Sequence, residues 1–111
     1  MDISISTRHG ELPSDIQGRI GEKARKLPKF FERLTSIEVT VDLKNHQEPE
    51  VEIKASAEQR DDVIAKSSGA NVIAAMDAAV HKMERQLVKH KEKITGHRNP
   101  SHKHLELESN D

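Results

Sequence analysis

Residues 37–57 read IEVTVDLKNHQEPEVEIKASA, and this stretch decides the fold. Apolar and polar residues alternate from 37 to 44, and they alternate again from 51 to 57. Such alternation is typical of strands that turn one face to a core and the other to water. The segment between the two runs contains Asn45 and Pro49 and is typical of a turn. We therefore predict two neighbouring strands joined as a hairpin.

Two shorter runs extend the predicted sheet in both directions along the chain. Residues 2–7 alternate with Ile3 and Ile5 on one face, and Gly10 breaks this run. A further short run covers about residues 61–67. The chain therefore has four candidate strands, one before and three after the segment between residues 13 and 34.

That segment has the pattern of an amphipathic helix. Pro13 and Asp15 suit a first helical turn, and Pro28 should end the helix near Leu27. Spacings of three and four place the apolar residues on one side of it: Leu12, Ile16, Ile20, Ala24, Leu27 and Phe31. Gly18 and Gly21 lie inside it, each at a cost of up to about 1 kcal/mol relative to alanine.

A second and longer helix is predicted from Ala70 to Thr95, with Gly96 just beyond its end. Its apolar face consists of Val72, Met76, Val80, Met83, Leu87 and Ile94. At 1.5 Å per residue it would be roughly 39 Å long, so we expect its C-terminal end to project beyond the sheet. The order β-α-β-β-β-α predicts an α+β fold, a two-layer sandwich with both helices on one face of a four-stranded sheet, similar to a double-stranded-RNA-binding domain. Residues 1–98 would form this domain, and residues 99–111 a flexible acidic, histidine-containing tail.

Composition excludes several classes of protein. The chain has 111 residues and no cysteine, which rules out a disulfide scaffold, a cysteine zinc site and a thiol nucleophile. Its two aromatic residues, Phe30 and Phe31, are too few for a base-stacking surface. No apolar run approaches the roughly 20 residues of a membrane span, and the N-terminus has no signal-like core, so we expect a cytoplasmic protein.

The sequence offers little support for catalysis, a cofactor or a metal. Adjacent Asp61 and Asp62 would point to opposite faces of a strand and would not converge. Gly18 and Gly21 do not form a phosphate-binding glycine motif. Histidines in the predicted tail lack the rigid frame that a structural zinc site needs. We therefore expect no enzyme, no catalytic or metal-binding residue, no cofactor and no small-molecule substrate.

Charge is unevenly distributed although the net charge is only -1. Residues 13–34 hold six basic and three acidic groups, and residues 78–98 hold six basic and two acidic groups. Residues 35–77, the strand region, hold four basic and nine acidic groups. Both helices are therefore basic and the sheet is acidic.

On each helix the basic residues recur at helical spacing. The basic stripe of the second helix consists of Lys82, Arg85, Lys89 and Lys93, and that of the first of Arg19, Lys23 and Lys26. Such a stripe suits a polyanion, although it is also the ordinary pattern of a solvated helix face. Charge alone leaves both interpretations open.

The second helix also carries a longer motif. Residues 77–93, DAAVHKMERQLVKHKEK, resemble the signature helix of the ribosome hibernation-promoting factors, a family that includes protein Y and carries the older label sigma-54 modulation protein. The resemblance extends to the N-terminal Ile3-Ser4-Ile5 and to Phe30-Phe31, and covers roughly residues 1–98. The predicted element order agrees with the fold of that family.

The resemblance implies a function and a set of site residues. Family members bind small-subunit ribosomal RNA in the channel for messenger RNA and the A- and P-site transfer RNAs, and they silence ribosomes in stationary phase or under stress. A monomer off the ribosome is expected. The positions that match the family's RNA-binding residues are Arg8, Lys23, Lys26, Lys29, Lys82, Arg85, Gln86, Lys89 and Lys93.

Two alternatives remain open at this point. A protein-binding regulator, as the sigma-54 label suggests, would need an exposed apolar patch. A generic binder of double-stranded RNA would bind naked duplex as well as ribosomes. The chain resembles the short class of the family, and its tail does not decide between promoting and opposing ribosome dimerisation.

Overall fold

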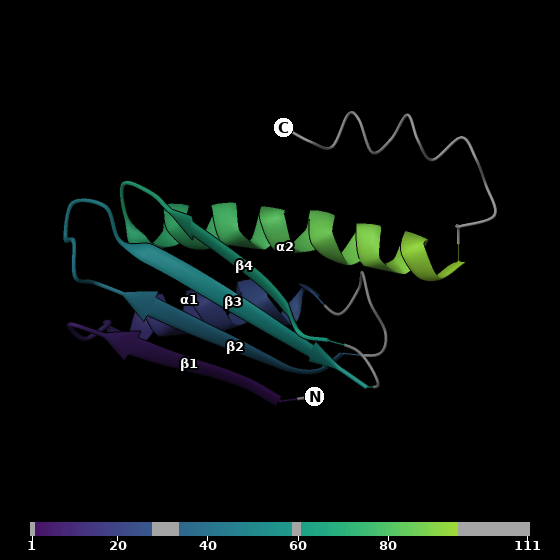
Figure 1. Ribbon diagram of the computed structural model, residues 1–111. Helices are drawn as coiled ribbons and strands as arrows, with labels where there is room; N and C mark the ends of the chain where they lie inside the picture. The colour runs from purple at the N-terminus through teal and green to yellow at the C-terminus, as the bar shows by residue number, and fades with distance from the viewer. Residues whose placement is uncertain (1, 28–33, 59–60, 96–111) are drawn as a thin grey trace.

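The computed structural model describes residues 2–27, 34–58 and 61–95, and in the last helix it describes side chains as far as Lys89. These ranges contain six elements in the predicted order. The bounds are β1 Asp2–Arg8, α1 Ser14–Arg25, β2 Leu34–Asp42, β3 Glu50–Ala57, β4 Val63–Ser68 and α2 Val72–Thr95. Figure 1 shows the sheet as one layer with the two helices as the other.

The four strands form one sheet in the order β1-β2-β3-β4. β2, β3 and β4 are successively antiparallel, so the predicted hairpin of β2 and β3 is confirmed. β1 runs parallel to β2, with Ile5 opposite Val39. A parallel pair needs a long crossover connection, and α1 supplies it. β1 and β4 are therefore the two edges of the sheet.

The core lies between the sheet and the helices. Strand residues at alternate positions, among them Val39 and Ile53, are fully buried, as are Ile20 in α1 and Met76 and Met83 in α2. α2 packs over β4 and β3, and α1 packs beside α2 and over β1. None of the helices in the described ranges has the length and apolar character needed to cross a membrane. The predicted two-layer α+β architecture is confirmed.

Several element boundaries differ from the predicted ones; β2, for example, runs from Leu34 to Asp42 and not from Ile37 to Lys44. α2 begins at Val72 and not at Ala70, because the Oδ1 atom of Asn71 accepts a hydrogen bond from the backbone N–H of Ala74 at 2.8 Å and caps the helix. β4 begins at Val63, so Asp62 precedes the strand; its Oδ2 atom lies 3.5 Å from the Nζ atom of Lys54. The expected helix stops at Pro28 and Gly96, and the predicted tail, lie outside the described residues.

One glycine of α1 has no role in the packing of the described chain. A Cβ atom at Gly18 would have no neighbour within 4 Å, whereas one at Gly69 would lie 2.8 Å from the backbone nitrogen of Ala75. We therefore expect Gly18→Ala to stabilise the protein by up to about 1 kcal/mol, because alanine favours the helix. Gly69→Ala is the matched control and should destabilise it. Chemical denaturation followed by circular dichroism measures both, and a loss of stability in Gly18→Ala would contradict this account.

Candidate nucleic-acid interface

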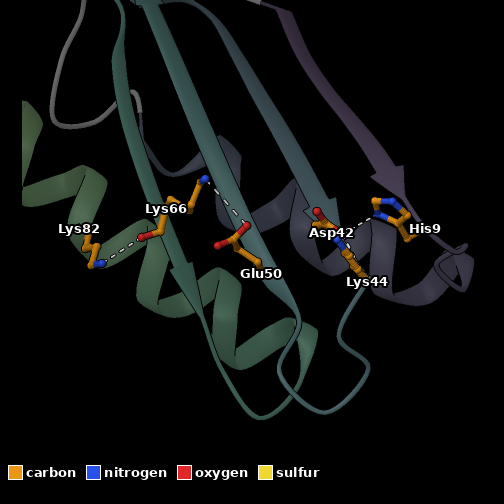
Figure 2. Close-up of polar contacts among 6 residues, drawn as sticks. All are labelled: His9, Asp42, Lys44, Glu50, Lys66 and Lys82. Carbon is orange, nitrogen blue, oxygen red and sulfur yellow. Dashed lines mark hydrogen bonds and ion pairs between the residues drawn. The ribbon is translucent and has the colours of Figure 1, made fainter.

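The flank of α2 that faces β4 is fixed to the sheet edge by two side chains. The Nζ atom of Lys82 donates a hydrogen bond to the carbonyl oxygen of Lys66 at 2.9 Å, as Figure 2 shows. One helical turn later, the Nε2 atom of Gln86 donates to the carbonyl oxygen of Ile64 at 3.1 Å. Four helical residues rise about 6 Å, and two strand residues advance roughly 6.6 Å, so the two spacings match. These two hydrogen bonds, which we call the edge contacts, add to the buried packing of Met83 and Leu87 in holding α2 against the sheet.

The basic stripe of α2 begins at Lys82, which makes one of these contacts, and continues along the helix. Lys82 and Lys89 are exposed and Arg85 is partly buried. Helical spacing places the three on one side of α2. The side chain of Lys93 lies outside the described residues, although its position lies within the helix.

The basic side chains on the sheet differ from those on α2 in their partners. The Nζ atoms of Lys54 and Lys66 each lie near a carboxylate, at 3.5 Å from Asp62 and 4.0 Å from Glu50. Among the described side chains, no carboxylate lies within 4.0 Å of the Nζ atom of Lys82 or Lys89. Among the described side chains, the positive charges of Lys82 and Lys89 are therefore less neutralised than those of Lys54 and Lys66.

α1 contributes its basic residues differently. The Nζ atom of Lys23 lies 2.7 Å from Oδ1 of Asp77 in α2, so this predicted RNA contact already has an ion-pair partner. The side chain of Asp77 is 57% exposed, and such surface pairs contribute at most about 1 kcal/mol, so a phosphate can replace the carboxylate at small cost. Lys26 is exposed at the C-terminal end of α1. Lys29 lies outside the described residues.

Arg8 is exposed at the end of β1, opposite Asp42 of β2. Oδ1 of Asp42 accepts a hydrogen bond from the backbone N–H of Lys44 at 2.9 Å and lies 2.9 Å from Nδ1 of His9 (Figure 2). The Lys44 hydrogen bond, and then the contact with His9, hold the pKa of Asp42 below its ordinary value of 3.8. His9 itself has a left-handed backbone, with φ of 62°, which turns the chain out of β1. Arg8 therefore stands beside a carboxylate that is fixed by other groups.

The lowered pKa of Asp42 predicts a pH dependence. The Asp42 carboxylate takes up a proton less readily in the folded protein than in the unfolded chain. Its contribution to stability is therefore complete above about pH 4 and is lost as the pH falls through the lowered pKa. We expect the free energy of unfolding of Asp42→Asn to fall less steeply between pH 4 and pH 2 than that of the wild type. Urea denaturation at a series of pH values measures this, and identical slopes would contradict it.

Sequence reasoning placed the basic residues on the correct helices but missed their partners. The edge contacts and the His9–Asp42 contact had no signal in the residue pattern, because the former use backbone acceptors and the latter joins residues 33 positions apart. The cap of α2 did have one, since asparagine directly before an apolar helical run is a favoured cap residue. The described residues contain no group of three or more histidine and carboxylate side chains able to hold a metal ion. What the arrangement offers chemically is a set of charged donors for an extended anion.

Three comparisons with known proteins point in the same direction. A family model described as Sigma 54 modulation protein / S30EA ribosomal protein matches residues 3–95. The chain is 31% identical over 94 residues to the ribosome hibernation promoting factor of Azotobacter vinelandii, covering 84% of this chain and 85% of that protein. Its fold is similar to that of a ribosomal subunit interface protein from Coxiella burnetii, with a TM-score of 0.74, 16% identity and coverage of 82% and 98% of the two chains. The N-terminal domain of Thermus thermophilus Protein Y gives a TM-score of 0.70 at 22% identity, with coverage of 80% and 98%.

Proposed function

The chain belongs to the Sigma 54 modulation protein / S30EA ribosomal protein family, and we propose on that premise that it is a ribosome hibernation factor of the cytoplasm. It binds small-subunit ribosomal RNA in the channel for messenger RNA and the A- and P-site transfer RNAs. It inhibits translation in stationary phase or under stress. In dilute solution off the ribosome it is a monomer, and it carries out no catalytic reaction.

The observation that carries the proposal is the state of the α2 basic stripe. Lys82 and Lys89 are exposed and have no carboxylate partner among the described side chains, and they belong to a helix held in place by the edge contacts. A helix whose position is already set presents its lysines to phosphates without a further loss of backbone freedom on binding. Phosphate contacts orient a protein on RNA without reading sequence. Inhibition then follows from occupation of the channel.

The two exposed large apolar residues of the described chain argue against a protein-binding regulator. Ile64 is 48% exposed on β4 and Val88 is 40% exposed on α2. Because Gln86 contacts β4, Val88 two residues later lies on the far side of the helix, so the two do not form one patch. A binding site for a regulatory protein would need a contiguous apolar surface.

Co-sedimentation with purified ribosomes in a density gradient tests the proposal. We expect the protein to travel with the small subunit and with whole ribosomes at low salt. About eight phosphate contacts, at roughly 0.7 to 0.9 each, predict that log affinity falls by roughly five to seven units per unit of log salt. A flat salt response, or no sedimentation with ribosomes at low salt, would contradict the proposal.

A naked RNA duplex of about 20 base pairs serves as the competitor in the same experiment. We expect it to displace the protein from ribosomes only at large excess. Equal affinity for the duplex would favour the generic double-stranded RNA binder instead.

A further inference from the structure

The two edges of the sheet are not equivalent. In β4 the residues that face β3 are the odd-numbered ones, since the N–H of Gly69 donates to the carbonyl of Pro49 on that side. The carbonyls of Ile64 and Lys66 therefore point outward, and the edge contacts from α2 occupy both. A strand from another molecule meets side chains of α2 at this edge.

None of the described residues covers the β1 edge in this way. The carbonyl of Arg8 accepts a hydrogen bond from the N–H of Leu43, so the even-numbered residues of β1 face β2. The N–H and C=O groups of Ile3, Ile5 and Thr7 point away from the sheet, and none of them has a partner among the described residues. Natural edges are usually protected by charged residues, prolines or bulges. The segment from 3 to 7 reads ISIST and has none of these.

We propose that β1 is an interface between two copies of this chain, in which the two β1 strands pair antiparallel about a two-fold axis at Ile5. This axis is the one that pairs all seven residues of the strand. It also pairs the outward-facing groups with one another, Ile5 with the partner's Ile5 and Ile3 with the partner's Thr7. Three such pairs exchange six backbone hydrogen bonds.

Charge selects the same register. The two charged residues of β1 are Asp2 and Arg8, at its opposite ends, and both side chains are exposed on the outer face of the sheet. Antiparallel pairing about Ile5 places Asp2 opposite the partner's Arg8, and Arg8 opposite the partner's Asp2. A shift by two residues in either direction leaves both charges without these partners. Opposite charges directly across two strands are favourable.

α1 leaves space above this edge. A Cβ atom at Gly21 would lie 3.8 Å from the side chain of Ile5, so this side of α1 faces β1. Gly18, three residues earlier on the same side, has open space where a side chain would lie. Packing within one copy therefore does not require glycine at position 18, and the open space there is compatible with a second copy at the β1 edge.

The interface is expected to be weak and dependent on concentration. One pair of seven-residue strands provides less than the roughly 800 Å² per partner of a standard stable interface. The monomer expected from the sequence remains the prediction for dilute protein, and the dimer the prediction at hundreds of micromolar. Because Arg8 is also a proposed RNA contact, ribosomes should compete with the dimer for it.

Disulfide trapping tests the register directly, since the natural chain contains no cysteine. In the proposed pairing Ser4 faces the partner's Ser6 at a Cα separation of about 4.5 Å, which suits a disulfide. We expect an equimolar mixture of Ser4→Cys and Ser6→Cys proteins to form a covalent dimer under mild oxidation, at least tenfold faster than either variant alone. Equal rates for the mixture and the single variants, or no dimer from any of them, would overturn the proposal.

Sedimentation equilibrium tests the charge pairing. Asp2→Lys and Arg8→Glu should each raise the dimer dissociation constant at least tenfold, because like charges then face one another. A mixture of the two variants should dimerise as the wild type does, since every facing pair again has opposite charges. Failure of the mixture to recover dimerisation, or a wild type that is monomeric at 1 mM, would overturn the proposal. Neither experiment contains ribosomes, so its failure leaves the proposed function untouched.

Discussion

The triple variant Lys82→Glu, Arg85→Glu, Lys89→Glu is expected to lose ribosome affinity by about a thousandfold or more. Charge-assisted hydrogen bonds contribute roughly 1.5 kcal/mol or more each, so the loss of three predicts a change of more than 4 kcal/mol, before any repulsion from the new carboxylates. Gradient co-sedimentation at fixed salt measures the effect. The variant protein should remain in the top fractions under conditions where the wild type travels with the small subunit.

The matched control reverses three lysines elsewhere on the sheet side of the molecule. Lys44→Glu, Lys54→Glu, Lys66→Glu changes the net charge by the same amount, at one exposed loop position and two positions on the outer face of the sheet. We expect this variant to retain ribosome binding within a few-fold. A similar loss in both triple variants would mean that net charge, and not the α2 stripe, governs binding.

Lys82 needs separate treatment because it also makes an edge contact. Lys82→Glu removes the hydrogen bond to the carbonyl of Lys66 and can shift α2 against β4. The double variant Arg85→Glu, Lys89→Glu keeps both edge contacts and is expected to lose most of the affinity. Circular dichroism and thermal denaturation of every variant separate loss of binding from loss of fold.

The fold was largely predictable from local patterns. The alternation in residues 37–57 and the 3.6-residue periods of both helices report which side of each element is buried, and burial is what the sequence encodes most directly. Val39, Ile53, Ile20, Met76 and Met83 are all buried as these patterns require. The parallel direction of β1 followed from the intervening helix only once the strand order was known, because residue patterns do not identify neighbours in a sheet.

The candidate site was predictable to the level of the helix face and no further. Helical spacing placed Lys82, Arg85 and Lys89 together, and the described positions agree with it. That Lys23 pairs with Asp77, and that Gln86 donates to a strand carbonyl, depends on how α2 lies against α1 and β4. These contacts join elements far apart in sequence, and one of them uses a backbone acceptor that every residue type provides.

Met83→Ala is expected to destabilise the protein by roughly 2 to 5 kcal/mol, because the lost side chain leaves a cavity that the core fills only in part. Met83 is fully buried on the side of α2 that packs against the sheet, directly after Lys82 in the chain. For a domain of this size each 1 kcal/mol lowers the melting temperature by roughly 4 to 8 °C. Thermal denaturation should therefore show a fall of at least 8 °C.

Val88→Ala is the matched control on the same helix. Val88 is 40% exposed, and exposed substitutions usually change stability by no more than about 0.5 kcal/mol. A large effect at Val88 would mean that residues outside the described ranges cover it. Below its melting temperature Met83→Ala should still bind ribosomes, because it leaves the basic stripe and both edge contacts in place. Loss of binding by a folded Met83→Ala protein would mean that the geometry of the basic stripe depends on core packing beneath Met83 as well as on the edge contacts.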